Sequence, residues 1–260
     1  MRTSRRARWG QGLIGLAALM VVLEMLPRVG LVSARYLPPF STMVEALSEE
    51  LGQPAFWSAL LETVKAWGVG LAIALVLGIT LGLVIGSVPL LRTMTSSTIE
   101  FLRPIPSVAL IPLVVLMFGT RIESTLVLVV YASVWQVLIQ VLYGVQDVDP
   151  VVRETARSYR FRPLSLVRHV IWPTALPYVM TGFRLAATVA LVLTITAELV
   201  IGSPGLGKEI AVAQSSGAVA SMYALVIVTG ILGVLVNLLV RALERRTLAW
   251  HPSFRAEVHR

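Results

Sequence analysis

Long apolar runs constrain this chain more than any other feature. Hydrophobic residues make up 56% of its 260 residues and charged residues only 14%, whereas ordinary soluble domains carry about 25% charged residues. A spanning helix needs about 20 mainly apolar residues to cross roughly 30 Å of hydrocarbon. We therefore predict an all-α membrane protein with one transmembrane domain over residues 1–260. Six spans are expected, at residues 10–26, 64–87, 101–119, 124–145, 177–201 and 221–243, the third bent by Pro104 and Pro106.

The positive charge of the chain predicts its orientation in the membrane. The net charge is +8, but the basic residues stand in short blocks beside apolar runs, which indicates positive-inside topology and not nucleic-acid binding. With the amino terminus inside, fifteen Lys and Arg residues fall in internal segments and four in external ones. Both termini should be cytoplasmic. The internal blocks are Arg2, Arg5, Arg6 and Arg8, then Arg92, then Arg153, Arg157, Arg160, Arg162 and Arg168, and finally Arg241, Arg245, Arg246, Arg255 and Arg260.

The first apolar run has a second interpretation, as a cleavable signal peptide ending near Val32-Ser33-Ala34. Glu24 and Pro27 interrupt the run, and the small-residue site lies far past its end, so we favour an uncleaved anchor. The chain contains no cysteine, which excludes disulfides, thiolate metal sites and cysteine nucleophiles.

The internal segment 146–176 carries signals for a projecting, kinked structure. Asp149 is a good N-cap and Pro150 suits the first helical position, so a helix should run from there to about Tyr159. Pro163 disfavours helical geometry at the preceding residue, which places a break near 160–162. A second short helix should then lead back to the membrane at Pro173. A polar, kinked knob on the cytoplasmic face is a docking surface.

In this segment the sequence resembles the permeases of bacterial binding-protein-dependent ATP-binding-cassette (ABC) importers. Their "EAA" motif reads Glu-Ala-Ala, three residues, Gly, nine residues, Ile-x-Leu-Pro. The matching positions here are Glu154-Thr155-Ala156, then Arg160 in place of the glycine, and Val170, Trp172 and Pro173. The wider resemblance is to the nitrate/sulfonate/taurine branch, and it is carried by Leu102–Pro106, Arg168–Pro177, Ala197-Glu198-Leu199 and Gly205-Leu206-Gly207.

The resemblance implies a type I ABC importer permease with the MetI-like fold, in the bacterial cytoplasmic membrane. It implies a non-catalytic transport subunit without a cofactor or metal of its own, since ATP and Mg are bound by a partner ATPase. Its partners would be a second permease copy (a homodimer), two cytoplasmic ATPases, an extracytoplasmic solute-binding protein and the lipid bilayer. The solute would be a small organic anion or oxyanion such as sulfonate, taurine or nitrate; a vitamin-precursor permease and a secondary transporter are the alternatives.

The residues expected to couple the permease to the ATPase lie on the knob, with Glu154 facing the ATPase and Ala156 packing in its cleft. They are Arg153, Glu154, Thr155, Ala156, Arg157, Tyr159, Arg160 and Pro163. Glycine at the position of Arg160 permits a left-handed turn, and an arginine there is sterically disfavoured. We therefore expect a turn of different shape, formed with the help of Pro163.

Polar residues in the fifth span are candidates for the translocation pathway or its gate. Glu198, Thr194 and Thr188 lie there, and intramembrane acids by default suggest a pathway or pairing role. The alternative for Glu198 is a structural bond to a backbone amide or a neighbouring helix, and threonine commonly bonds its own backbone. Gly202–Lys208 resembles a P-loop, but Glu209 replaces the required hydroxyl, so we predict a turn. Gly78, Gly82 and Gly86 have the spacing of a close helix contact, with lining of the pathway as the alternative.

Overall fold

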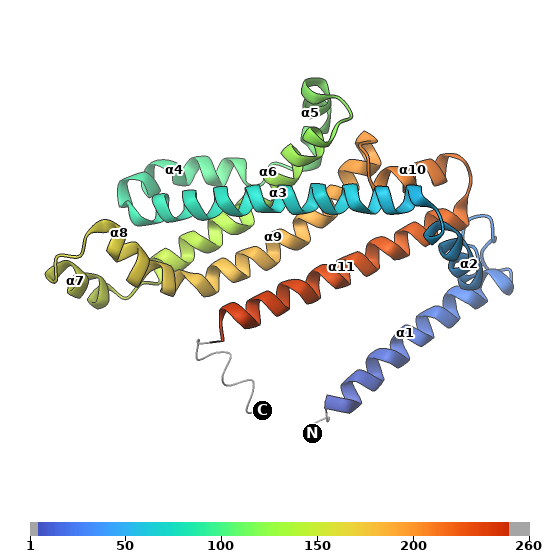
Figure 1. The fold of residues 1–260 in the computed structure, drawn as a ribbon, viewed down its shortest axis with the longest axis horizontal. Coiled ribbons are helices and arrows are strands. Elements are labelled where there is room, and N and C mark those ends of the chain that lie inside the picture. The colour runs from blue at the N-terminus through green and yellow to red at the C-terminus, as the bar shows by residue number, and fades with distance from the viewer. Residues whose placement is uncertain (1–4, 250–260) are drawn as a thin grey trace.

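The computed structural model describes residues 5–249, a range in which all regular secondary structure is helical (Figure 1). Arg2, Arg255 and Arg260, which belong to the predicted basic blocks, lie outside the described residues. The α-helices are α1 (Arg5–Arg28), α2 (Phe40–Leu51), α3 (Pro54–Ser87), α4 (Pro89–Leu102), α5 (Ile111–Phe118), α6 (Ile122–Gln146), α7 (Pro150–Ser158), α8 (Pro163–Leu166), α9 (Trp172–Ile201), α10 (Leu206–Ser215) and α11 (Val219–Thr247). A 3₁₀ turn covers Ser107–Leu110 and a π-helical turn covers Val167–Ile171.

Four helical segments of the described chain are long and apolar enough to cross a membrane. They are α3, α6, the run from Pro163 to Ile201, and α11, and a fifth is added if α4 and the bent segment Ser107–Phe118 form one span. The predicted all-helical membrane fold is confirmed. Helix α1 is 24 residues long and exposes apolar side chains such as Ile14 and Leu19; the count of six spans stays a prediction.

Helix α6 packs between α3 and α9 and forms the most extensive contacts of the fold with both (Figure 1). On the α3 side, glycines face valines: a Cβ added to Gly78 or Gly82 would lie 2.6 Å from the Cβ of Val137 or Val141. On the α9 side, a Cβ added to Gly182 would lie 3.1 Å from the Cα of Val137 in α6. Small residues let membrane helices approach until their backbones nearly touch, which maximises van der Waals contact. The glycine spacing in α3 therefore serves this helix interface.

The third membrane element begins earlier than the expected span at residues 101–119. Helix α4 starts at Pro89, and the chain bends by 80° between Leu102 and Ser107. The bend contains Pro104 and Pro106, as expected, and the Tyr131 hydroxyl donates a 2.7 Å hydrogen bond to the Leu102 carbonyl oxygen. Hydropathy alone misses α4 because one of its faces is polar.

The segment after the knob also differs from the expected short helix and separate span. From Pro163 the chain stays helical through α8, the π-helical turn and α9 to Ile201, as one 39-residue element. Pro173 lies in the first turn of α9, and Pro177 lies inside it. Proline is tolerated in membrane helices when neighbouring groups compensate for the lost hydrogen bond, so neither proline ends the element.

Helices α2 and α10 lie at one end of the molecule and α7 at the opposite end (Figure 1). At the α2 end, the Glu24 carboxylate of α1 accepts a 2.8 Å hydrogen bond from the Ser41 backbone N–H. Ser41 is in the first turn of α2, where backbone N–H groups lack helical partners. Glu24 thus caps α2 and connects α1 to the remaining helices.

The α3–α6 contact predicts a specific sensitivity to volume. Gly82→Ala should lower the free energy of unfolding by about 1–3 kcal/mol, because the added methyl group meets Val141 at van der Waals overlap. Gly68→Ala is the matched control, since no atom lies within 4 Å of the added Cβ. Thermal unfolding of both purified variants in detergent measures the difference. Equal stability of the two variants would contradict the close contact.

Candidate functional site

Helix α7 is the short helix that stands apart from the membrane bundle (Figure 1). Its start is set as the sequence predicts: the Asp149 carboxylate accepts a 2.7 Å hydrogen bond from the Val151 N–H, and Pro150 occupies the first turn. This cap satisfies one of the backbone donors that a helix start leaves free. The knob therefore has a defined beginning immediately after α6 ends at Gln146.

The end of α7 is a Schellman turn with Arg160 in the left-handed conformation, at φ +52°. The Arg160 N–H donates to the Arg157 carbonyl at 2.8 Å, and the Phe161 N–H donates to the Ala156 carbonyl at 3.0 Å, which is the bonding pattern of this motif. The expectation that arginine would reshape the turn is corrected by this geometry. Arg160 adopts the left-handed turn at a steric cost of about 1–2 kcal/mol, because the two hydrogen bonds hold it there.

The expected coupling residues divide into an exposed and an inward-facing set. Glu154 and Arg157 are exposed, and Tyr159 is 77% exposed. Ala156 is only 6% exposed, so it packs within this chain, contrary to the expectation that it fills a cleft of the ATPase. The remaining exposed members are Thr155, Arg160 and Pro163.

Arg153 links α7 to the membrane bundle. Its Nη2 donates a 3.2 Å hydrogen bond to the carbonyl oxygen of Val145 in the last turn of α6. Val145 is fully buried, and its side chain faces Gly86 of α3. The hydrogen bond between Arg153 and Val145 therefore connects α7 directly to the α3–α6 interface.

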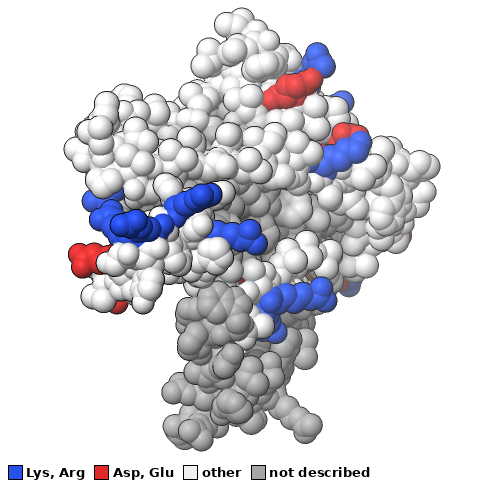
Figure 2. Space-filling view, turned by 60° about the vertical axis from the view of Figure 1, so that its left-hand side comes forward, with Lys and Arg blue, Asp and Glu red and all other residues white. Residues whose placement is uncertain are grey.

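Figure 2 turns the α7 end of the molecule toward the viewer. Charged side chains form small groups on a mainly uncharged surface, and the largest group of basic side chains crosses the left of this view next to a few acidic ones. An exposed charged surface beside an apolar bundle faces water or a charged partner, since lipid would not solvate it.

Glu198, the first of the candidate pathway residues, lies in a buried polar cluster at the other end of α9. Its Oε2 accepts hydrogen bonds from the Thr63 hydroxyl at 2.9 Å and from the Gly207 N–H at 3.0 Å. The Leu206 N–H donates to the same Thr63 hydroxyl at 2.8 Å, and Gly205 packs directly on the carboxylate. The carboxylate joins α9, α3 and the start of α10, an arrangement that favours the structural interpretation of Glu198.

The two candidate threonines do not join this cluster. The Thr194 hydroxyl donates to the Ala190 carbonyl at 2.8 Å and the Thr188 hydroxyl to the Arg184 carbonyl at 3.2 Å, each one turn back along α9. Thr194 is fully buried and Thr188 is exposed. Both hydroxyl groups donate to carbonyl oxygens of their own helix, so these hydrogen bonds give no sign of a solute site. The predicted turn at Gly202–Lys208 is shorter than expected: Gly202–Gly205 connects α9 to α10, and the residues from Leu206 to Lys208 already belong to α10.

Sequence reasoning missed an ion pair between Arg184 of α9 and Glu244 of α11. Glu244 is buried, and its carboxylate holds the arginine side chain across the two helices. The usable signal was the rarity of charge in these segments, because an ionised group among apolar residues needs a partner. Within residues 5–249, no group of three or more His, Asp or Glu side chains is placed to hold a metal ion.

The strained turn predicts that glycine is the better residue at position 160. Arg160→Gly should stabilise the protein by about 0.5–1 kcal/mol, because relief of the left-handed strain exceeds the extra backbone entropy of glycine. Arg157→Gly, inside α7, is the matched control and should destabilise by about 1 kcal/mol. Denaturant unfolding in detergent measures both changes. A loss of stability in Arg160→Gly equal to that in the control would contradict the strain.

Comparisons with known proteins agree with this arrangement. The chain is 28% identical to the putative aliphatic sulfonates transport permease protein SsuC of Bacillus subtilis (strain 168), covering 96% of this chain and 91% of the relative. It is 31% identical to the taurine transport system permease protein TauC of Escherichia coli (strain K12), covering 95% of each. Its fold resembles a chain of the MetNI methionine ABC transporter in an inward-facing conformation, with a TM-score of 0.62 and 19% identity over 75% of this chain and 99% of that chain. Residues 54–249 match the family model for the binding-protein-dependent transport system inner membrane component. The chain is therefore a multi-pass ABC-importer permease and belongs to the binding-protein-dependent transport system inner membrane component family.

Proposed function

We propose that this permease forms half of the pathway of an importer for a small organic anion or oxyanion, and that α7 couples it to a cytoplasmic ATPase. One observation carries the coupling role: a capped, projecting helix presents the exposed Glu154 and is bonded to the membrane bundle through Arg153. The solute class rests on the sulfonate-bearing compounds for which the relatives are named, aliphatic sulfonates and taurine.

The proposed coupling follows the contacts from α7 inward. Displacement of α7 by an ATPase pulls on Arg153 and so on the Val145 carbonyl at the end of α6. Because α6 is packed rigidly against α3 and α9, it moves as a body with them. A switch between two pathway states needs a partner that contacts the two states differently, and the exposed face of α7 offers such contacts.

The proposed topology has six spans, with both termini in the cytoplasm. The start of α1 and the end of α11 both point toward the end of the molecule that carries α7 (Figure 1), which supports this orientation together with the charge distribution. The six spans are then α1, α3, the bent α4–α5 pair, α6, the run from Pro163 to Ile201, and α11.

The proposed assembly has two permease copies, two ATPases that bind ATP and Mg, and an extracytoplasmic solute-binding protein. The chain itself performs no catalytic step in this proposal. Its family places it with permeases that depend on a binding protein, and this excludes the secondary-transporter alternative.

Glu154→Lys tests the coupling proposal. The substitution replaces attraction toward a basic ATPase group by repulsion, so binding of the ATPase should weaken by about 30-fold or more, equivalent to about 2 kcal/mol. Solute uptake should be lost while the protein still inserts and folds, since Glu154 is exposed outside the bundle. Pull-down of the ATPase from detergent and uptake by cells are the two measurements.

Glu49→Lys is the control, because it makes the same charge change at an exposed position on α2, at the opposite end of the molecule. It should leave binding of the ATPase unchanged. Normal binding of the ATPase by Glu154→Lys would contradict the assignment of α7 as the coupling element.

The topology is tested by single thiols in a chain that has no cysteine. Lys208→Cys and Ser158→Cys both replace exposed residues. A membrane-impermeant thiol reagent should label the first in intact cells, and the second only after the membrane is permeabilised. Labelling of Ser158→Cys from outside would refute the six-span arrangement.

A further inference from the structure

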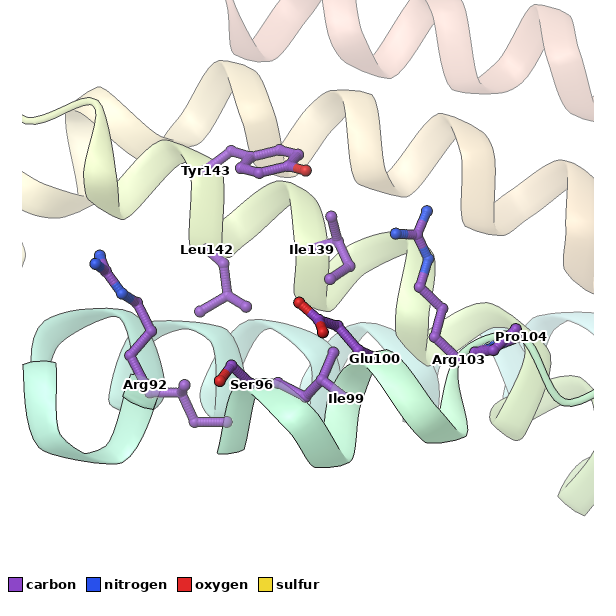
Figure 3. Close-up of a pocket in the computed structure, with 10 residues that line it drawn as sticks. Arg92, Ser96, Ile99, Glu100, Arg103, Pro104, Ile139, Leu142 and Tyr143 are labelled. Atoms are coloured by element: carbon purple, nitrogen blue, oxygen red, sulfur yellow. The ribbon is translucent and has the colours of Figure 1, made fainter. Parts of the chain in front are cut away.

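A cavity of about 500 Å³ lies between α4, α3 and α6. Its walls combine apolar residues of α6, such as Ile139 and Leu142, with charged residues of α4 (Figure 3). Arg92, Glu100 and Arg103 project from α4 toward the side where Tyr143 lies (Figure 3). The volume is in the range of about 300–1,000 Å³ typical of small-molecule sites.

The residues of α4 fall on three faces, because successive residues of an α-helix are rotated by about 100°. One face is half-buried against the bundle and consists of Leu91, Thr95, Ile99 and Leu102. A second, exposed face is apolar and contains Leu90, Met94 and Phe101. The third face is the polar stripe Arg92, Ser96, Glu100 and Arg103, which lines the cavity. Charged side chains that face lipid are costly, so this stripe indicates that one side of α4 does not contact lipid.

Arg103 lies where α4 ends and the chain bends by 80°. It is about 16 Å along the helix from Arg92, so the stripe runs from the end of α3 to the bend, and all four of its residues are exposed in this chain. Irregular backbone at membrane depth is tolerated where it lines a water-filled cavity or is buried in protein. An arginine there is costly unless it faces such a space.

The charges of the stripe leave an excess of one positive charge. Among residues 5–249, no ion pair joins Glu100 to Arg92 or Arg103, so both guanidinium groups retain free donors. A guanidinium group binds the oxygens of an oxyanion through parallel N–H bonds. The nearby carboxylate weakens that attraction, which suits a site that must release its ligand as well as accept it.

We propose that the polar stripe of α4 is a low-affinity route for a small oxyanion on the translocation pathway, with Arg92 and Arg103 as two successive anion-binding residues along it. This rests on the proposed function, and it adds where in the permease the anion is held. The sulfonate, nitrate or phosphate group of the ligand is the shared chemistry; we assign it to the transported solute and not to a lipid headgroup.

A thiol at Ser96 tests the site directly, because the chain has no cysteine of its own. Full-length Ser96→Cys in phosphatidylcholine nanodiscs is reacted with an anionic sulfonatoethyl and a cationic trimethylammonioethyl methanethiosulfonate, with rates normalised to free cysteine. The anionic reagent should react faster. Arg92→Gln in the same background removes a charge about 6 Å along the helix from position 96 and should lower the ratio by about two- to fivefold, whereas Arg103→Gln, about 10 Å away, should lower it by a smaller factor. Arg241→Gln, which is exposed on α11, is the matched control and should leave the ratio unchanged.

Added sodium methanesulfonate should slow the anionic reagent more than an equal concentration of sodium chloride. Mixing phosphatidylglycerol into the nanodisc lowers the ratio of every variant through the surface potential of the bilayer, but the fold-change caused by Arg92→Gln should persist. Failure of both reagents to react, equal rates or a faster cationic reagent in phosphatidylcholine, or loss of the Arg92→Gln effect with phosphatidylglycerol would each overturn the site. Pull-down of the ATPase by Arg103→Gln distinguishes the two proposals. Retained ATPase binding together with reduced charge selectivity supports the anion site. The coupling role of α7 is tested only by Glu154→Lys.

Discussion

The contact of α6 with α3 and α9 is the interaction on which the rest of the structure depends. Lipid chains are as apolar as the side chains of a membrane helix, so burial from water does not drive these helices together. Close van der Waals packing does so instead, and it needs small residues where the backbones meet. Gly78 and Gly82 let the Val137 and Val141 side chains reach the α3 backbone, and Gly182 does the same for α9 on the other side of α6.

This packing gives the coupling element something rigid to act on. Val145 belongs to the α3–α6 contact through its side chain and to the α7 contact through its carbonyl oxygen, which accepts from Arg153. The same residue therefore joins the membrane bundle to the projecting helix. At the other end of the bundle, Glu198 ties α9 to α3 and α10 through Thr63 and Gly207. Between these two ends, glycines of α3 meet valines of α6 from Gly70 to Gly86.

Helix α4 is packed less tightly than α6. Only one of its faces rests on the bundle, and its polar stripe borders a cavity in place of a neighbouring helix. The Leu102 carbonyl at the bend accepts hydrogen bonds from the Ile105 N–H at 3.2 Å and from the Tyr131 hydroxyl at 2.7 Å, and both bonds stabilise the break. A loosely held, polar element beside a rigid bundle is the part of this fold best suited to contact a moving solute.

The sequence by itself determined the membrane class, the main apolar helices, the N-cap at Asp149 and the glycine interface of α3, because each depends on composition or on spacing within one helix. Local rules failed where partners come from distant segments. They placed a separate span after Pro173, although one helix runs on from Pro163 to Ile201, and they treated Arg160 as a residue that would reshape its turn. Tertiary structure alone decided that Glu198 meets Thr63, that Arg184 meets Glu244, and that the polar face of α4 lines a cavity. The physical reason is the same in all three cases: a polar group in an apolar chain needs a partner or a polar cavity, and only the packing of the helices determines which of them lies within reach.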